Sequence, residues 1–191
     1  MSPLTSRAGV VVIDFETFPD ATAITDSTPI TTQFPGLTFT NTTVISAGIT
    51  LNEFEFPPHS WSNVGFDDGG PISITFASSI LSFGAYFTYT VPLTLSAFDG
   101  ANNLVARATP AFSNNLALSG DSGSSPNEFL SLSFPSGIVR VSITGDPAGS
   151  SFVFDDLTVE TSDTGVVPEP TSLTLVLISM AASFAMRKKI L

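Results

Sequence analysis

Two pairs of carboxylates lie near opposite ends of the sequence. Asp14 and Glu16 follow the first apolar run, and Asp155 and Asp156 lie within the last one. If the strands that carry these pairs are neighbours, the four carboxylates come together, and without a cation they would repel one another. Calcium takes six to eight oxygen ligands, so the four residues are a candidate calcium site. The alternative is a set of solvated acids at strand ends.

A second group of polar residues lies between Glu53 and Asp68. Glu53 and Glu55 are predicted to share one face of a strand. The loop that follows contains side chains able to bind a metal or a sugar, namely His59, Trp61, Asp67 and Asp68. Paired carboxylates also hydrolyse glycosides, but two carboxylates at i and i+2 on one strand do not flank a substrate from both sides. A polar strand face and a proline-rich loop are the alternative interpretation.

Aromatic side chains offer a third kind of site, because they can stack on the apolar face of a sugar. The chain has one tryptophan and two tyrosines. Tyr86 and Tyr89 are three positions apart and would face opposite ways on a strand, so at most one of them joins Trp61. The alternative is packing of these rings in the core or at an edge.

Catalytic motifs are poorly represented. His59 is the single histidine, and no serine has the Gly-x-Ser-x-Gly surroundings of a nucleophile elbow. Nucleotide-binding glycine motifs are absent from the sequence. The chain has no cysteine, which excludes disulfides, zinc–thiolate sites and cysteine nucleophiles. We therefore expect a protein that is not an enzyme.

The charge distribution is strongly acidic before the C-terminus. Residues 1–163 carry three arginines against 16 acidic residues, a net charge of −13. Such a surface repels phosphate backbones, so nucleic acid is not expected as a partner, whereas divalent cations would be attracted. Charged residues make up 12% of the chain, against about 25% in an average protein. Serine, threonine, glycine and proline take their place, which favours strands and tight turns.

Apolar and polar residues alternate with a period of two along most of the chain, which predicts strands. Glycine, proline and aspartate clusters separate these runs, and no helical stripe occurs before Pro168. Residues 21–32 are expected to form a loop. Ten short strands at this spacing predict an antiparallel sandwich or barrel with a phenylalanine-rich core. The expected strands are 10–15, 37–40, 44–51, 72–76, 80–90, 93–97, 104–108, 129–133, 139–143 and 152–159.

The C-terminus has a pattern of three parts. A proline-rich motif precedes 16 uncharged residues, 171–186, and a basic cluster follows them. As a helix, 16 residues span roughly 24 Å, and snorkelling lysines extend that reach. We expect a transmembrane helix over 171–186 with its basic end in the cytoplasm; the alternative is an ordinary buried helix. The motif is Val167, Pro168, Glu169 and Pro170, and the cluster is Arg187, Lys188 and Lys189.

This three-part pattern resembles the PEP-CTERM sorting signal. The resemblance implies recognition by an exosortase, a membrane-embedded transpeptidase, and cleavage near Pro170. It implies export from a Gram-negative-type bacterium that makes exopolysaccharide, first as a membrane-anchored precursor and then at the cell surface or in the extracellular matrix. It also implies a secretory signal peptide, which residues 1–13 do not supply, so we expect a further stretch before Met1.

The remainder of the chain is similar to domains carried by many PEP-CTERM proteins, through residues 26–31, 51–60, 67–71, 126–129 and 154–159. Such domains are similar to jelly-roll sandwiches of the carbohydrate-binding-module kind. That resemblance implies a structural calcium on Glu16 and Asp156, completed by backbone carbonyls. The expected organisation is a disordered N-terminus over 1–7, a jelly-roll-like antiparallel β-sandwich over 8–160, a linker over 161–167 and the sorting signal over 168–191.

These observations favour a non-enzymatic surface or matrix protein that contacts exopolysaccharide. A calcium-dependent, lectin-like carbohydrate-binding module is the alternative function. A polysaccharide hydrolase is the second alternative, and it would depend on Glu53 and Glu55.

Overall fold

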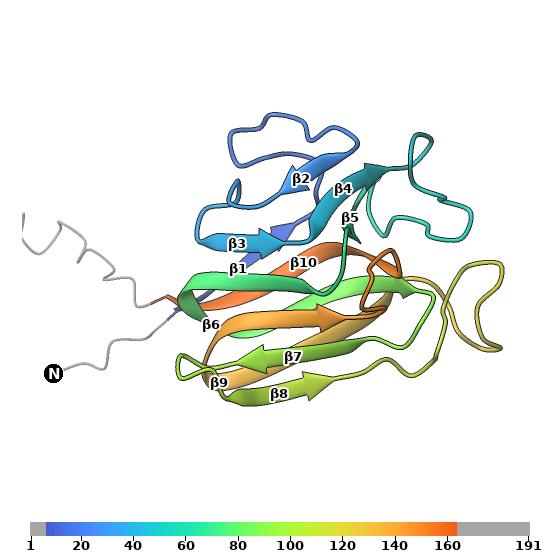
Figure 1. The fold of residues 1–191 in the computed structure, drawn as a ribbon. Coiled ribbons are helices and arrows are strands. Elements are labelled where there is room, and N and C mark those ends of the chain that lie inside the picture. The colour runs from blue at the N-terminus through green and yellow to red at the C-terminus, as the bar shows by residue number, and fades with distance from the viewer. Residues whose placement is uncertain (1–6, 164–191) are drawn as a thin grey trace, which may run out of the picture. The chain divides into compact units, whose positions relative to one another are not determined.

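The computed structural model describes residues 7–163, and every regular element in this range is a β-strand (Figure 1). No helix within 7–163 is long and apolar enough to cross a membrane. The sorting motif, the basic cluster and the expected transmembrane helix lie outside the described residues. The strands are β1 (Arg7–Ile13), β2 (Thr28–Ile30), β3 (Leu37–Thr40), β4 (Thr42–Ser46), β5 (Asn63–Asp67), β6 (Ile72–Tyr89), β7 (Thr94–Phe98), β8 (Leu104–Ala108), β9 (Glu128–Thr144) and β10 (Phe152–Asp163).

Two long strands, β6 and β9, belong to both halves of an antiparallel sandwich. The first part of β6 pairs with β3 on one side and with the last part of β9 on the other. The last part of β9 also pairs with β7, and β7 pairs with β8. The second part of β6 pairs with the first part of β9 and with β10. From β10 the order continues through β5 and β4 to β2, and β1 also pairs with β10.

The core lies between these two halves. Aromatic contacts cross it, from Phe154 on β10 to Phe15 at 5.2 Å, and through Phe34 to Phe39 on β3. Phenylalanine suits this position because its ring needs no hydrogen-bond partner when buried. The alternation of side chains along β6 leaves the opposite face of its second half turned away from the core.

A smaller apolar cluster lies outside the main core. Ile45, Leu51, Val64 and Val153 are buried together, with Phe56 packed against them. Leu51 and Phe56 come from the loop between β4 and β5, residues 47–62, which this cluster holds against β4, β5 and β10. The loop is thereby placed next to the outward face of β6 and β10.

The expected strands agree with the structure to different degrees. Strands β3 and β8 have the predicted ends. The expected strands 72–76 and 80–90 are one strand, β6, because the ladder continues across register shifts between Thr75 and Ile80. Likewise 129–133 and 139–143 are both parts of β9.

Other predictions need correction. Residues 21–32 are not entirely loop, since they contain β2, and residues 63–67, predicted as loop, form β5. Strand β4 ends at Ser46 rather than at residue 51. Strand β10 extends to Asp163, past residue 161, where the sequence predicts the linker to begin.

Candidate functional site

The last residues of the 47–62 loop are held from two sides by carboxylates. On one side, Asp155 Oδ2 accepts the backbone N–H of Ser60 at 2.7 Å. On the other side, Glu16 Oε1 accepts the backbone N–H groups of Ser62 at 2.9 Å and Asn63 at 2.7 Å. We call Asp155 and Glu16 the carboxylate clamps. Trp61 is the residue between the two clamped positions.

Trp61 has an unusual backbone conformation and an unusual environment. Its φ is 47°, in the left-handed region that a bulky side chain rarely adopts. Its side chain is 86% exposed. A strained backbone that presents a large apolar ring to solvent is a feature found preferentially at binding and active sites.

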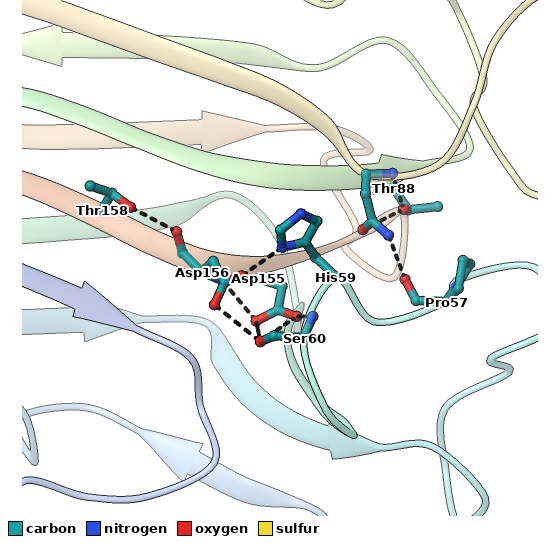
Figure 2. Close-up of polar contacts among 8 residues, drawn as sticks. Pro57, His59, Ser60, Thr88, Asp155, Asp156 and Thr158 are labelled. Atoms are coloured by element: carbon teal, nitrogen blue, oxygen red, sulfur yellow. Dashed lines mark hydrogen bonds and ion pairs between the residues drawn. The ribbon is translucent and has the colours of Figure 1, made fainter.

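A bulge in β10 places two aspartates beneath this loop. The pairing of β10 with β6 shifts between Asp155 and Thr158, and Asp156 has a φ of 47°. Asp156 Oδ1 accepts the Ser60 hydroxyl at 3.0 Å, and its Oδ2 lies 2.6 Å from His59 Nδ1 (Figure 2). Asp156 therefore connects two consecutive loop residues to the sheet.

The two aspartates differ in their exposure. Asp155 is only 1% exposed. Its burial raises the pKa of its carboxyl to about 6, although the N–H groups of Ser60 and Asp156 favour the ionised form. The Asp156 side chain is 19% exposed, and that of His59 is 35% exposed. Asp156 and His59 can therefore reach a ligand at the surface, and Asp155 cannot.

Three rings form an aromatic face beside the bulge. The imidazole of His59 stacks on Tyr86 of β6, with ring centroids 3.4 Å apart and planes 9° apart. Tyr86 lies 5.0 Å from Phe129 of β9, which is 50% exposed. We call His59, Tyr86 and Phe129 the aromatic face. Polar groups continue it along β6 and β10, where the Ser82 hydroxyl donates to Glu160 Oε2 at 3.1 Å.

The geometry of these groups favours binding over acid–base or nucleophilic chemistry. The hydroxyl of Ser60 donates to the carboxylates and makes no hydrogen bond to His59, so the serine has no base to activate it. Asp155 and Asp156 are neighbours in sequence, and one of them is buried, so they do not flank a substrate as glycosidase carboxylates do. The groups that reach solvent are aromatic rings and hydrogen-bonding side chains.

The four predicted calcium ligands are engaged in other contacts. Asp14 Oδ1 accepts the N–H of Glu16 at 3.0 Å, and Glu16 and Asp155 serve as the clamps. Within residues 7–163, no three side chains of the histidine, aspartate or glutamate type gather as a metal site. Calcium binding stays a prediction and gains no support from this arrangement.

The carboxylates predicted between residues 53 and 68 also do not form one site. Residues 53–56 form a turn rather than a strand, so Glu53 and Glu55 do not share a strand face. Glu55 Oε2 accepts the N–H groups of Leu118 and Ser119 in another loop. Asp67 is buried at the end of β5, where it accepts the N–H groups of Ser151 and Phe152. Asp68 is exposed and accepts the Thr43 hydroxyl at 2.8 Å.

The two tyrosines of the aromatic prediction lie on opposite faces of β6. Tyr89 is fully buried, and its hydroxyl donates to Glu128, whereas Tyr86 lies on the outward face. Sequence reasoning missed Ser60 and Phe129. A signal for Phe129 was present, because it alternates with Ser131 and Ser133 opposite the buried Leu130 and Leu132.

Comparisons with known proteins give a fold likeness alone. No family model matches the chain, and no curated protein matches it. The chain is similar to the K2 cleaved adhesin domain of Lys-gingipain, with 12% identity and a TM-score of 0.47 over 79% of this chain and 99% of that one. It is similar to a mutant carbohydrate-binding module of family 29, with 13% identity and a TM-score of 0.43 over 85% of this chain and 99% of that one. It is also similar to the CBM22-1 xylan-binding domain from Paenibacillus barcinonensis Xyn10C, with 11% identity and a TM-score of 0.42 over 84% of this chain and 99% of that one.

Proposed function

We propose that the described domain binds polysaccharide without catalysis, through Trp61 and the aromatic face. The observation that carries this proposal is the exposure of Trp61 in a left-handed backbone conformation. Trp61 lies two residues after His59, which belongs to the aromatic face. A folding requirement alone would favour glycine or asparagine at such a position. A tryptophan there is best explained by a contact with something outside the molecule.

The aromatic face adds the second half of the site. Its rings offer apolar surfaces for the C–H faces of sugar rings, and Glu160 and Ser82 lie on the neighbouring stretch to bind hydroxyl groups. A few apolar contacts with a small number of directed polar groups are typical of small-molecule and sugar sites. The acidic surface favours a neutral or cation-bridged polysaccharide over a polyanion.

The non-enzymatic part of this proposal is supported by the contacts of the carboxylates. Glu16, Glu55 and Asp155 each accept hydrogen bonds from backbone N–H groups of loops. The hydrolase alternative relied on Glu53 and Glu55 as a strand pair, and the turn at 53–56 removes that arrangement.

The test of binding is a titration of the domain with soluble β-linked hexasaccharides of glucose, mannose and xylose. We expect saturable heat for at least one of them in calorimetry, and a tenfold or greater loss of affinity in Trp61→Ala, equivalent to at least about 1.4 kcal/mol. The matched control is Leu118→Ala, which removes another exposed apolar side chain, 76% accessible, from a different loop. Equal affinities for the two variants and the unaltered domain would refute the assignment of the site.

We propose further that the chain is sorted through residues 167–191 by an exosortase and placed in or on an exopolysaccharide matrix. The support is the sequence pattern alone: the motif Val167–Pro170, the uncharged run 171–186 and the basic cluster Arg187–Lys189. A polysaccharide-binding domain would be of direct use to a protein delivered to that location.

Sorting is tested by fractionation of cells that express two altered chains. Deletion of 168–191 should move the protein from the membrane fraction to the soluble fraction. Replacement of Pro168, Glu169 and Pro170 by alanine keeps the apolar run, so that protein should stay in the membrane but escape cleavage. Recovery of the deleted chain in the membrane fraction would contradict the anchor.

A further inference from the structure

We propose that Glu16 and Asp155 are positioning residues for Trp61, which hold the indole toward solvent without touching the ligand. This inference rests on the proposed function, in which Trp61 contacts polysaccharide. It adds how the chain fixes the orientation of the Trp61 ring.

The two clamps come from distant parts of the chain. Glu16 belongs to the segment after β1, and Asp155 belongs to β10, yet they bind the residues directly before and after Trp61. Asp155 is 1% exposed, and both oxygens of Glu16 accept hydrogen bonds from the loop, the second from the Ser62 hydroxyl at 3.3 Å. Both carboxylates therefore have partners in the loop, and Asp155 has almost no exposed surface to offer a ligand.

The segment that carries Glu16 is itself held in place by buried hydrogen bonds. The buried Asn63 side chain donates to the carbonyls of Phe15 and Ile24, both at 3.0 Å, and accepts the Ser46 hydroxyl at 2.6 Å. Phe15, the residue before Glu16, is itself buried with a φ of 61°. A strained conformation persists only where the surroundings over-determine it, and these contacts do so.

The clamps oppose the unfavourable left-handed conformation of Trp61. A left-handed tryptophan is unfavourable by itself, so a loop free at both ends would return residue 61 to an extended or right-handed conformation. That change would redirect the side chain. The Ser62 N–H belongs to the peptide group that directly follows Trp61, and the Ser60 N–H belongs to the peptide group between His59 and Ser60. A backbone change at residue 61 would therefore disturb charge-assisted hydrogen bonds on both sides of it.

The single tryptophan makes the inference measurable, because all indole emission comes from residue 61. In Glu16→Ala we expect the steady-state anisotropy of Trp61 to fall toward that of a flexible peptide, and the affinity for the bound hexasaccharide to fall at least fivefold. Glu16→Gln keeps an Oε1 acceptor and should restore both. The matched control is Glu55→Ala, which removes a carboxylate that anchors the 117–119 loop and should change neither quantity.

The outcomes separate this inference from the proposed function. Unchanged anisotropy in folded Glu16→Ala overturns the positioning role, as does lower anisotropy with full affinity. Failure of every hexasaccharide to bind overturns the proposed function, while anisotropy still decides whether the clamp orders Trp61. If Glu16→Ala does not fold, hydrogen exchange of the unaltered domain decides instead: slow exchange of the Ser62 and Asn63 amides supports the clamp, and exchange at the rate of an open loop overturns it.

Discussion

Glu16 Oε1 accepts the backbone N–H of Ser62 at 2.9 Å and so joins the segment after β1 to a loop 46 positions later in the chain. The same oxygen also accepts the N–H of Asn63. The sequence suggests Glu16 as a metal ligand, and in the structure its carboxylate anchors the loop that presents Trp61.

Replacing Trp61 by glycine should stabilise the fold relative to replacing it by alanine. Both changes remove the exposed ring, but only glycine adopts a φ of 47° without strain. We expect Trp61→Gly to exceed Trp61→Ala by about 1 kcal/mol in the free energy of unfolding, or about 2–4 °C in Tm. Thermal and urea unfolding of both variants measure this difference, and identical stabilities would show that residue 61 carries no strain.

Burial of Asp155 should make the domain lose stability as the pH rises from about 4 to about 6. Its pKa is about 6 in the folded state against 3.8 unfolded, so the native state binds the proton more tightly over this range. Ionisation then destabilises the fold, by up to roughly 3 kcal/mol for a shift of this size. Burial also raises the pKa of Asp67, which acts in the same direction.

The variant Asp155→Asn tests this pH dependence. The amide oxygen can still accept the Ser60 N–H, but it has no proton to lose. Urea unfolding between pH 4.5 and pH 7 should therefore show a shallower slope than in the unaltered domain. A slope as steep as that of the unaltered domain would show that Asp155 does not titrate in this window.

Gly84 should be required for the position of Phe129. A Cβ at residue 84 would lie 2.6 Å from Cζ of the Phe129 ring, which is closer than real contacts allow. Because Phe129 is half exposed, Gly84→Ala is expected to displace the ring toward solvent with little loss of stability. We expect the affinity for polysaccharide to fall about fivefold, or about 1 kcal/mol, in calorimetry. Unaltered affinity would remove Phe129 from the site.

The two tyrosines should respond in opposite ways to substitution. Tyr89→Phe removes a buried hydroxyl that donates to Glu128, so it should cost about 1–2 kcal/mol of stability and leave binding intact. Tyr86→Ala removes an outward ring and should weaken binding several-fold while Tm changes little. Unfolding and binding measurements on both variants check this division. Loss of binding in Tyr89→Phe, with the fold intact, would contradict it.

The strands with regular alternation could be predicted from sequence, and those with irregular composition could not. Strand β3 alternates cleanly, strand β8 is a mostly apolar run, and both have the predicted ends. Strand β5 contains Gly65, which reads as a break, but the glycine is there because a Cβ would lie 2.5 Å from the Phe154 ring. That reason depends on a residue far away in the chain and is invisible to local patterns.

The residues of the candidate site were largely found from sequence, but their roles were not. Residue type and clustering drew attention to Glu16, His59, Trp61 and Asp155. Their division into anchors and contact groups depends on burial and on long-range hydrogen bonds, such as Ser60 N to Asp155. Sequence patterns do not show which carboxylate oxygens already accept hydrogen bonds from backbone N–H groups. Calcium binding at these carboxylates stays a prediction.

The most direct test of polysaccharide binding through Trp61 follows the single indole N–H resonance in a ¹H–¹⁵N correlation spectrum. The domain is titrated with the glucan, mannan and xylan hexasaccharides. We predict a saturable shift of that resonance with one of them, at the same midpoint as the calorimetric binding curve. Binding that leaves the indole resonance in place would contradict the account, and so would a resonance that none of the three sugars moves.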